Sequence, residues 1–266
     1  MTVLTSAARD SSVVAWRNLV TIKRNPDLLF GAVVNPIIFV LLFAYVFAGS
    51  LGGDGYRHFL VAGVFVQTVA FNSAFTTLGL TNDLTKGMID RFRSLPMSRL
   101  AVILGRTASD LVVSAVTLVI MTLAGLVVGW RIEGGPLDAV LGYLLLLLFA
   151  FAMSWVGGWI GLLCRSVEVA QSAGLIWLFP VSFIASVFVS AQTLPGPLRA
   201  FGEWNPISAV ADTTRRLFGN PIQPPGIPPA TGWVAEHAGL YAVGTSLLII
   251  AIFLPLALAR YRKVAS

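Results

Sequence analysis

Six long runs of apolar residues limit what this chain can fold into more than any other feature of its sequence. The runs cover about 28–48, 59–80, 105–129, 139–163, 169–191 and 239–259. Each is near the ~20 residues that an α-helix needs to cross a hydrocarbon core of ~30 Å. We therefore expect an all-α integral membrane protein with six transmembrane helices.

The composition excludes a soluble domain built around a single core. Hydrophobic residues make up 56% of the 266 positions and charged residues only 11%, and the mean hydropathy is +0.83. One soluble core cannot bury that much apolar surface. The formal charge of +6 would suit a nucleic-acid partner, but Lys and Arg beside membrane spans produce the same balance. Because the basic residues flank the runs, we expect contact with membrane lipid and no nucleic acid.

The distribution of Lys and Arg predicts the orientation in the membrane. Six spans place both termini on one side, and if that side is cytoplasmic, thirteen basic residues lie inside and five outside. The positive-inside rule favours this arrangement, although Arg199, Arg215 and Arg216 lie in a long outer segment that the rule weighs less. We expect a multi-pass protein of the plasma membrane with cytoplasmic N- and C-termini.

Residues 1–25 are predicted to form a helix that lies on the membrane surface. The stretch begins with polar residues and lacks an uninterrupted apolar core, so it is not a secretory signal peptide. Trp16 can face the lipid, and the basic residues can face an anionic inner leaflet. The interfacial anchor residues are Trp16, Arg17, Lys23 and Arg24. A basic tail without regular structure is the alternative.

The segment 81–104, between the second and third runs, contains the longest charged stretch, DLTKGMIDRFRSLPMSR. In it Leu84, Met88, Phe92 and Leu95 recur at helical spacing and form one apolar stripe. Pro96 ends the predicted helix because it cannot donate a backbone N–H. By itself, this pattern is typical of a linker helix that rests on the membrane surface.

The same segment resembles the cytoplasmic loop of type-2 ABC exporter permeases, particularly the daunorubicin-resistance branch. The pattern is an acid, three residues, Gly, a few residues, Arg, and then Leu-Pro followed by a basic residue. It is present here as Asp83, Gly87, Arg91 and the stretch LPMSR. Many members of the family have Glu where this chain has Asp83, and the shorter acid could alter its contact.

The resemblance implies a fold, a function and partners. In the family this loop carries the coupling helix, which docks on a separate ABC ATPase. The implied coupling residues are Asp83, Lys86, Gly87, Asp90, Arg91, Phe92, Arg93 and Pro96. Two ATPase subunits would bind the ATP and Mg, so this chain needs no cofactor of its own. A second permease copy, identical or a sister subunit, would complete the pathway, and residues 1–266 would form one transmembrane permease domain.

The outer segment 192–236 is predicted to contain short helices. Asn205-Pro206 supplies a cap and a proline for the first helical position. The following stretch GNPIQPPGIPPATG has five prolines and three glycines, which exclude regular structure. By resemblance to the family, the short helices between spans five and six would enter the outer leaflet and cover the pathway.

The sequence carries no pattern for catalysis. It contains no GxxxxGK[ST] motif, which is the phosphate-binding loop of ATPases. His58 and His237 have no carboxylates or cysteines at metal-binding spacing, and no serine lies in a GxSxG turn. We expect no catalytic, cofactor or metal site in this chain.

Polar residues inside the predicted spans are candidates for a substrate path, because such groups avoid lipid and face other helices or a cavity. The candidates are Gln67, Thr68, Asn72 and Thr76 in the second span and Ser182, Ser186 and Ser190, at spacings of four, in the fifth. Close helix packing is an equal alternative for the serines. Neither stripe is charged, which favours an amphipathic or lipid-like passenger.

Asp110 is the one acid well inside an apolar run, and Arg106 lies four residues before it. We expect the two to pair on one helix face. A proton relay would need further buried acids, so a proton-coupled secondary transporter is a weaker alternative.

The favoured function is the permease subunit of a bacterial ABC exporter for a drug, natural product or lipid. Polysaccharide or teichoic-acid export and a non-transporting scaffold remain open.

Overall fold

The structure is a computed structural model that describes residues 15–18, 20, 34, 36–47, 53–88 and 99–264. All regular structure in these ranges is helical. Five of the described helices are long and apolar enough to cross a membrane: Gly53–Thr85, Ile103–Val127, Pro136–Gly161, Val167–Ile184 and Ala238–Lys263. A shorter apolar helix, Pro36–Val46, which ends in the π-helix η1 (Phe43–Phe47), lies in the first predicted span. The all-α fold is confirmed, whereas the count of six spans remains a prediction.

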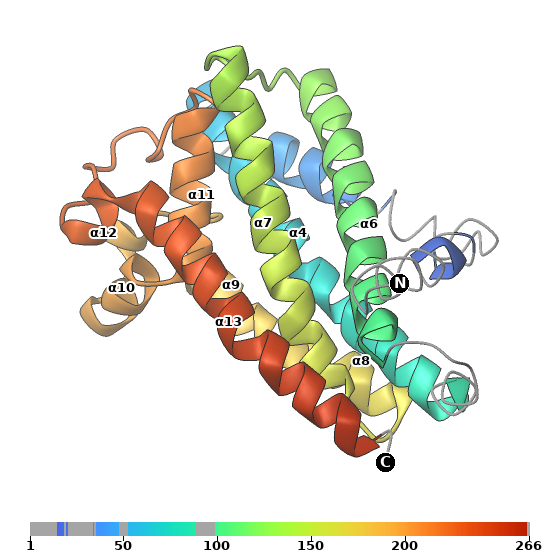
Figure 1. Ribbon diagram of the computed structural model, residues 1–266. Coiled ribbons are helices and arrows are strands. Elements are labelled where there is room, and N and C mark those ends of the chain that lie inside the picture. The colour runs from blue at the N-terminus through green and yellow to red at the C-terminus, as the bar shows by residue number, and fades with distance from the viewer. Residues whose placement is uncertain are drawn as a thin grey trace.

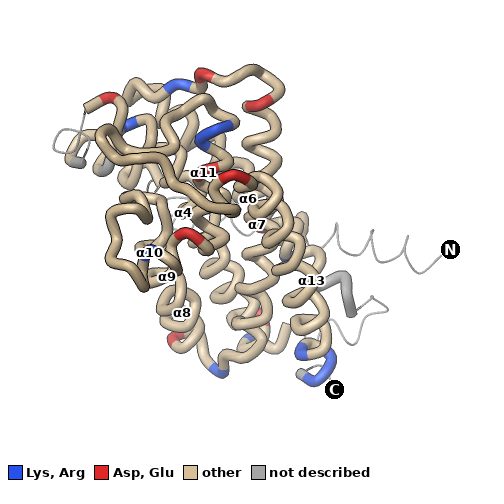
Figure 2. Tube along the Cα trace, turned by 90° about the vertical axis from the view of Figure 1, so that its left-hand side faces the viewer, with Lys and Arg blue, Asp and Glu red and all other residues tan. Residues whose placement is uncertain are grey.

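Helix α4 (Gly53–Thr85) lies at the centre of the bundle. It packs along α7 (Pro136–Gly161), with α6 (Arg99–Val127) and α8 (Val167–Ile176) beside it. Helix α13 (Ala238–Val264) covers α7 (Figure 1). The last turns of α4 and α13 lie at one end of the bundle, which we call the inner end after the predicted orientation. Figure 2 shows the basic C-terminal turn of α13 at this end.

Glycines on α7 allow α4 and α7 to approach closely. A Cβ atom at Gly157 would collide with the carbonyl oxygen of Ser73, and one at Gly161 would lie 2.7 Å from the carbonyl oxygen of Thr77. The freed space lets two hydroxyls of α4 bind the α7 backbone. Thr77 Oγ1 donates to the Gly157 carbonyl and Thr81 Oγ1 to the Gly161 carbonyl, both at 2.9 Å. Small residues and such hydrogen bonds are how helices associate where lipid surrounds them.

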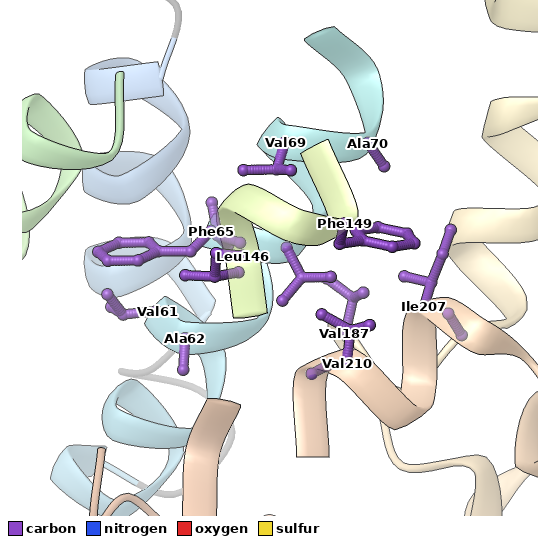
Figure 3. Close-up of a cluster of buried hydrophobic side chains, with 14 of the residues drawn as sticks. Val61, Ala62, Phe65, Val69, Ala70, Leu146, Phe149, Val187, Ile207 and Val210 are labelled. Atoms are coloured by element: carbon purple, nitrogen blue, oxygen red, sulfur yellow. The ribbon is translucent and has the colours of Figure 1, made fainter. Parts of the chain in front are cut away.

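An apolar core fills the space between α4, α7 and the outer helix α11 (Pro206–Leu217). Figure 3 shows Phe65 of α4, Leu146 and Phe149 of α7, and Val210 of α11 within one cluster of buried side chains. All four side chains are fully buried. Helix α11 is therefore part of the bundle core and does not lie outside the spans as a separate cover.

The fifth predicted span, 169–191, is wrong at its outer end. Two short helices, α8 and α9 (Leu178–Ile184), are separated at Trp177. Pro180 lies in α9, and because proline has no N–H it leaves the carbonyl of residue 176 without its helical partner. The helix ends at Ile184, since Ala185 is extended with φ −69° and ψ 155°. Residues 185–190 then lead to the 3₁₀ turn η2 (Ala191–Thr193).

The outer segment contains α10 (Gly196–Glu203), α11 and α12 (Trp233–Glu236). The predicted start at Asn205-Pro206 is confirmed, because the Asn205 side chain accepts a hydrogen bond of 2.9 Å from the Ile207 N–H. Leu198 and Phe201 on α10 are exposed, so this helix turns apolar side chains away from the bundle. The short outer helices are present, and their entry into the outer leaflet remains a proposal.

The contact between α4 and α7 generates a matched test on two adjacent glycines. Gly157→Ala should lower the free energy of unfolding by about 1–3 kcal/mol, because the new Cβ forces the helices apart. Gly158→Ala is the control, since a Cβ there meets nothing within 4 Å. Its effect should be at most about 1 kcal/mol, in the stabilising direction. Denaturant unfolding of the purified chain in detergent measures both, and equal effects would contradict the packing described.

Candidate functional site

The inner end of the bundle joins the N-terminal residues to the end of α4. Arg17 Nη2 lies 3.1 Å from Asp83 Oδ2, and Asn18 Nδ2 donates a hydrogen bond of 3.3 Å to Ser109 Oγ on α6. Asn18 is buried, whereas the Trp16 side chain is 70% exposed. Arg17 and Asp83, which the sequence assigned to separate roles at lipid and at an ATPase, therefore contact each other.

Two further predicted coupling residues terminate α4. The Lys86 N–H donates to the Asn82 carbonyl at 3.1 Å, and the Gly87 N–H donates to the Leu84 carbonyl at 3.0 Å. Gly87 has φ +64°, the left-handed conformation that glycine adopts most easily at a helix end. The predicted coupling residues Asp90, Arg91, Phe92, Arg93 and Pro96 lie outside the described residues, as do the predicted anchors Lys23 and Arg24.

The predicted polar stripe of the second span contacts α6. Asn72 Nδ2 donates to Ser114 Oγ at 3.2 Å, and Thr76 Oγ1 donates to Asp110 Oδ2 at 2.8 Å. These bonds satisfy polar groups that would otherwise be costly inside a membrane. Asn72 and Thr76 therefore hold α4 to α6 in this structure.

The other two residues of the stripe differ from each other. Gln67 is 4% exposed, and its Oε1 has no hydrogen-bond donor among the described residues. Thr68 is half-buried. Gln67 is thus the member of the stripe with a buried amide oxygen that lacks a partner in the described part of the chain.

The predicted pairing of Arg106 with Asp110 is confirmed. Arg106 Nε lies 3.2 Å from Asp110 Oδ1 on the next turn of α6. The guanidinium also donates from Nη2 to the Phe75 carbonyl of α4 at 3.1 Å. Asp110 therefore has a basic and a hydroxyl partner, which fits a structural role at the contact between α4 and α6.

The serine row of the fifth span does not share one helix face. Ser182 lies in α9, fully buried, and its hydroxyl has no partner among the described residues. Ser186 and Ser190 follow the end of α9, and each hydroxyl accepts a backbone N–H of the same connection, at 3.2 and 3.1 Å. The predicted helical spacing is wrong beyond Ser182, because the backbone is extended at Ala185.

A cavity of about 160 Å³ lies beneath the outer helices, and we call it the outer pocket. Ser186 and Ser190 form part of its wall, together with residues of α10, α11 and the connection through α12. The other charged, aromatic or large polar residues in its wall are Gln192, Glu203, Trp204, Asp212, Gln223 and Trp233. The structure thus brings two predicted path serines together with the outer segment, and it does not bring them together with the stripe on α4.

Each acid of the outer pocket has an arginine partner. Arg199 Nε lies 2.9 Å from Glu203 Oε1, and this hydrogen bond lowers the pKa of Glu203. Arg215 Nη1 lies 3.0 Å from Asp212 Oδ1. Burial raises the pKa of Asp212 to about 6, and the positive charge of Arg215 acts in the opposite direction. The pKa values of the two carboxyl groups are therefore shifted in opposite directions, because burial disfavours the charged form of Asp212.

Arg215 is the central residue that the sequence analysis missed. Its side chain is fully buried. Nε donates to the Phe59 carbonyl of α4 at 2.8 Å, Nη1 to the Ser186 carbonyl at 2.7 Å and Nη2 to the Val187 carbonyl at 3.0 Å. The guanidinium carbon lies 3.6 Å from the centre of the Phe59 ring. One side chain therefore ties α11 to α4 and to the connection after α9.

The bonding of Arg215 follows from the end of α9. The Ser186 and Val187 carbonyls lie beyond the end of α9, where the chain is no longer helical and offers them no intrahelical partner, and the planar guanidinium offers several donors in a fixed fork. The available signal was the spacing of Arg215 from Ile207 and Ala211, at eight and four residues, which places it on the same buried face of α11. The count of basic residues treated it only as an outer charge.

Comparisons with known proteins extend over most of the chain. Residues 10–218 match the ABC-2 type transporter family. The daunorubicin resistance ABC transporter permease protein DrrB1 of Streptomyces coeruleorubidus is 32% identical over 254 residues, which cover 93% of this chain and 84% of that protein. The probable doxorubicin resistance ABC transporter permease protein DrrC of Mycobacterium tuberculosis is 22% identical over 220 residues, or 81% and 78% of the two chains.

Two adjacent arginines give a matched test of the buried guanidinium. Arg215→Met leaves Asp212 and the bound carbonyls without their donor, and it should lower the free energy of unfolding by about 3–5 kcal/mol. Arg216 is exposed, and among the described residues its side chain donates to the Ala235 carbonyl alone, so Arg216→Met should cost about 0.5 kcal/mol or less. Denaturant unfolding in detergent measures both values. If Arg215→Met lowers the free energy of unfolding as little as Arg216→Met does, Arg215 does not hold the outer helices in place.

Proposed function

This chain belongs to the ABC-2 type transporter family, and we propose that it is the permease subunit of an ATP-driven exporter. The proposed passenger is a hydrophobic or amphipathic drug, natural product or lipid that leaves a bacterial cell. The observation that carries the proposal is the 32% identity to a daunorubicin resistance permease over 93% of the chain. A passenger of this kind also suits a bundle whose polar intramembrane residues are mostly uncharged.

We propose that separate subunits supply the ATP hydrolysis. The sequence has no phosphate-binding loop, so two ABC ATPase subunits would bind ATP and Mg, and a second permease copy would complete the pathway. The segment 81–104 would dock on the ATPase. Support comes from its attachment to α4, since Asp83, Lys86 and Gly87 lie at the end of the central helix. A force on this segment would act directly on α4.

In the proposed orientation, the inner end of the bundle faces the cytoplasm, and both termini lie on the cytoplasmic side of the plasma membrane. Lys86, Arg262 and Lys263 lie at this end, as the positive-inside rule requires. The outer pocket, which is lined by the short outer helices, then lies in the outer half of the protein. We propose that the passenger leaves by way of this pocket, past Ser186 and Ser190, and that Asn72 and Thr76 hold helices together. Gln67, Thr68 and Ser182 stay candidates for the path within the membrane.

Export and orientation can be tested together in inverted membrane vesicles that contain this chain and its proposed ABC ATPase partner. In such vesicles the cytoplasmic face meets the medium, so ATP added to the medium should drive accumulation of daunorubicin, followed by its fluorescence. Vesicles with an ATPase whose phosphate-binding lysine is replaced are the control. Accumulation of a labelled polysaccharide precursor in place of daunorubicin would contradict the proposed passenger, and accumulation without ATP would exclude the ABC mechanism.

The ion pair at the inner end generates a test of coupling. We propose that Asp83 acts by holding Arg17 against the end of α4, so Asp83→Arg should reduce ATP-driven export several-fold by placing two like charges together. The double exchange Arg17→Asp with Asp83→Arg should restore at least half of the export. Asp54→Arg is the control, because Asp54 also pairs with an arginine, Arg57, but lies at the outer end with its side chain 85% exposed. A double exchange that stays as defective as Asp83→Arg would show that Asp83 contacts the ATPase itself.

A further inference from the structure

The outer pocket has an acidic wall that lacks basic side chains. Glu203 and Asp212 line it, and no Lys, Arg or His is among its lining residues. Their arginine partners approach from outside the pocket. Glu203 is occupied twice at Oε1, by Arg199 Nε and by Gln192 Nε2, both at 2.9 Å. Among the described residues, the pocket therefore holds two acids and no cation.

Two acceptor atoms of the pocket have no donor among the described residues. Asp212 uses Oδ1 for Arg215, and its Oδ2 accepts no hydrogen bond in the described part of the chain. Gln223 Oε1 is buried without a partner. A buried acceptor without a donor costs free energy, so Gln223 Oε1 favours a group that brings donors, whereas Asp212 Oδ2 is not buried and is open to such a group. An ammonium group has three donors and no acceptor.

The remaining wall suits the rest of a polar head group. The hydroxyls of Ser186 and Ser208 already accept backbone N–H groups at 3.2 and 2.9 Å, so their protons remain available to donate to ligand oxygens. Trp204 and Trp233 line the pocket and are each more than half exposed. Indole faces attract cations and also contact apolar groups.

The outer pocket is large enough to enclose only a part of the proposed passenger. Its volume is about 160 Å³, whereas sites that enclose a drug-sized ligand measure roughly 300–1,000 Å³. A single polar ring with an amine fits, while the apolar body of the passenger must remain outside, against the exposed indoles. We propose that the outer pocket binds the amine-bearing head group of the exported passenger, with Asp212 as its counter-ion. This inference rests on the proposed export function and names the passenger's chemistry.

Binding at Asp212 would act on the bundle through Arg215. The same carboxylate contacts the pocket on one side and the Arg215 guanidinium on the other. An ammonium at Oδ2 shares the negative charge and weakens the attraction on Arg215. Arg215 binds the carbonyls of Ser186 and Val187 as well as α4. Asp212 thus belongs both to the head-group site and to the contacts that attach the outer helices to the bundle.

The test compares two probes that differ in one charge. Daunorubicin carries a protonated amine on its sugar, and N-acetyl-daunorubicin has the same rings with a neutral amide. Binding to the full-length chain with its ATPase in lipid nanodiscs is followed by drug fluorescence. Asp212→Asn should weaken daunorubicin binding roughly ten- to a hundredfold, as the loss of a charged hydrogen bond implies. Binding of the acetylated probe should change by less than about twofold.

Two further variants keep the result interpretable. Gln223→Leu removes the other unpartnered acceptor without touching Arg215, and it should weaken daunorubicin binding several-fold. Glu236→Gln removes an exposed outer acid that does not line the pocket, and it should leave both probes unaffected. Co-purification with the ATPase confirms that each variant is folded.

The outcomes separate this inference from the export function. If folded Asp212→Asn and Gln223→Leu bind daunorubicin as tightly as the parent, the head-group site is wrong while export stands. The site is equally wrong if both probes are lost alike, because the acid would then act through packing. If the unsubstituted chain neither binds nor exports either probe in the vesicle assay, the proposed export of such compounds is wrong, and the head-group site is then wrong as well.

Discussion

The outer half of this protein depends on the complete burial of one guanidinium group. Arg215 is 0% exposed and binds carbonyls from α4 and from the connection after α9. A buried charge is tolerated only where its hydrogen bonds and counter-charge are supplied. Asp212 and three carbonyls meet that condition. The break after α9, the inward position of α11 and the shape of the outer pocket all follow from this arrangement.

Helix α4 connects the two ends at which we place the functional steps. Its last turn carries Asp83, and Gly87 follows the end of the helix within the segment proposed to meet the ATPase. Near its start, the Phe59 carbonyl accepts a hydrogen bond from Arg215. Between these points α4 packs on glycines of α7 and bonds to polar side chains of α6. A displacement of α4 at the inner end would therefore reach the outer pocket through direct contacts.

Polar residues inside the bundle serve mainly to join helices. Asn72, Thr76, Thr77 and Thr81 of α4 all donate to α6 or α7. In lipid these groups find partners on neighbouring helices, because no water is available to them. Sequence spacing shows that such residues share a face, but it does not show whether that face meets a helix or a cavity. For this reason two of the predicted path residues of the second span, Asn72 and Thr76, proved to be contacts between helices.

The sequence by itself determined the membrane class, the all-α fold and the pairing of Arg106 with Asp110, because these depend on run length, composition and spacing along one helix. The start of α11 at Asn205-Pro206 was also predictable, since a capping side chain acts within its own turn. Only the tertiary structure decided that the fifth span ends at Ile184. An extended backbone at Ala185 is stable there because Arg215, thirty residues later, supplies donors to the following carbonyls. Contacts between residues so far apart leave no periodic signal in the chain, and the outer pocket, which rests on them, was visible only once the helices were packed.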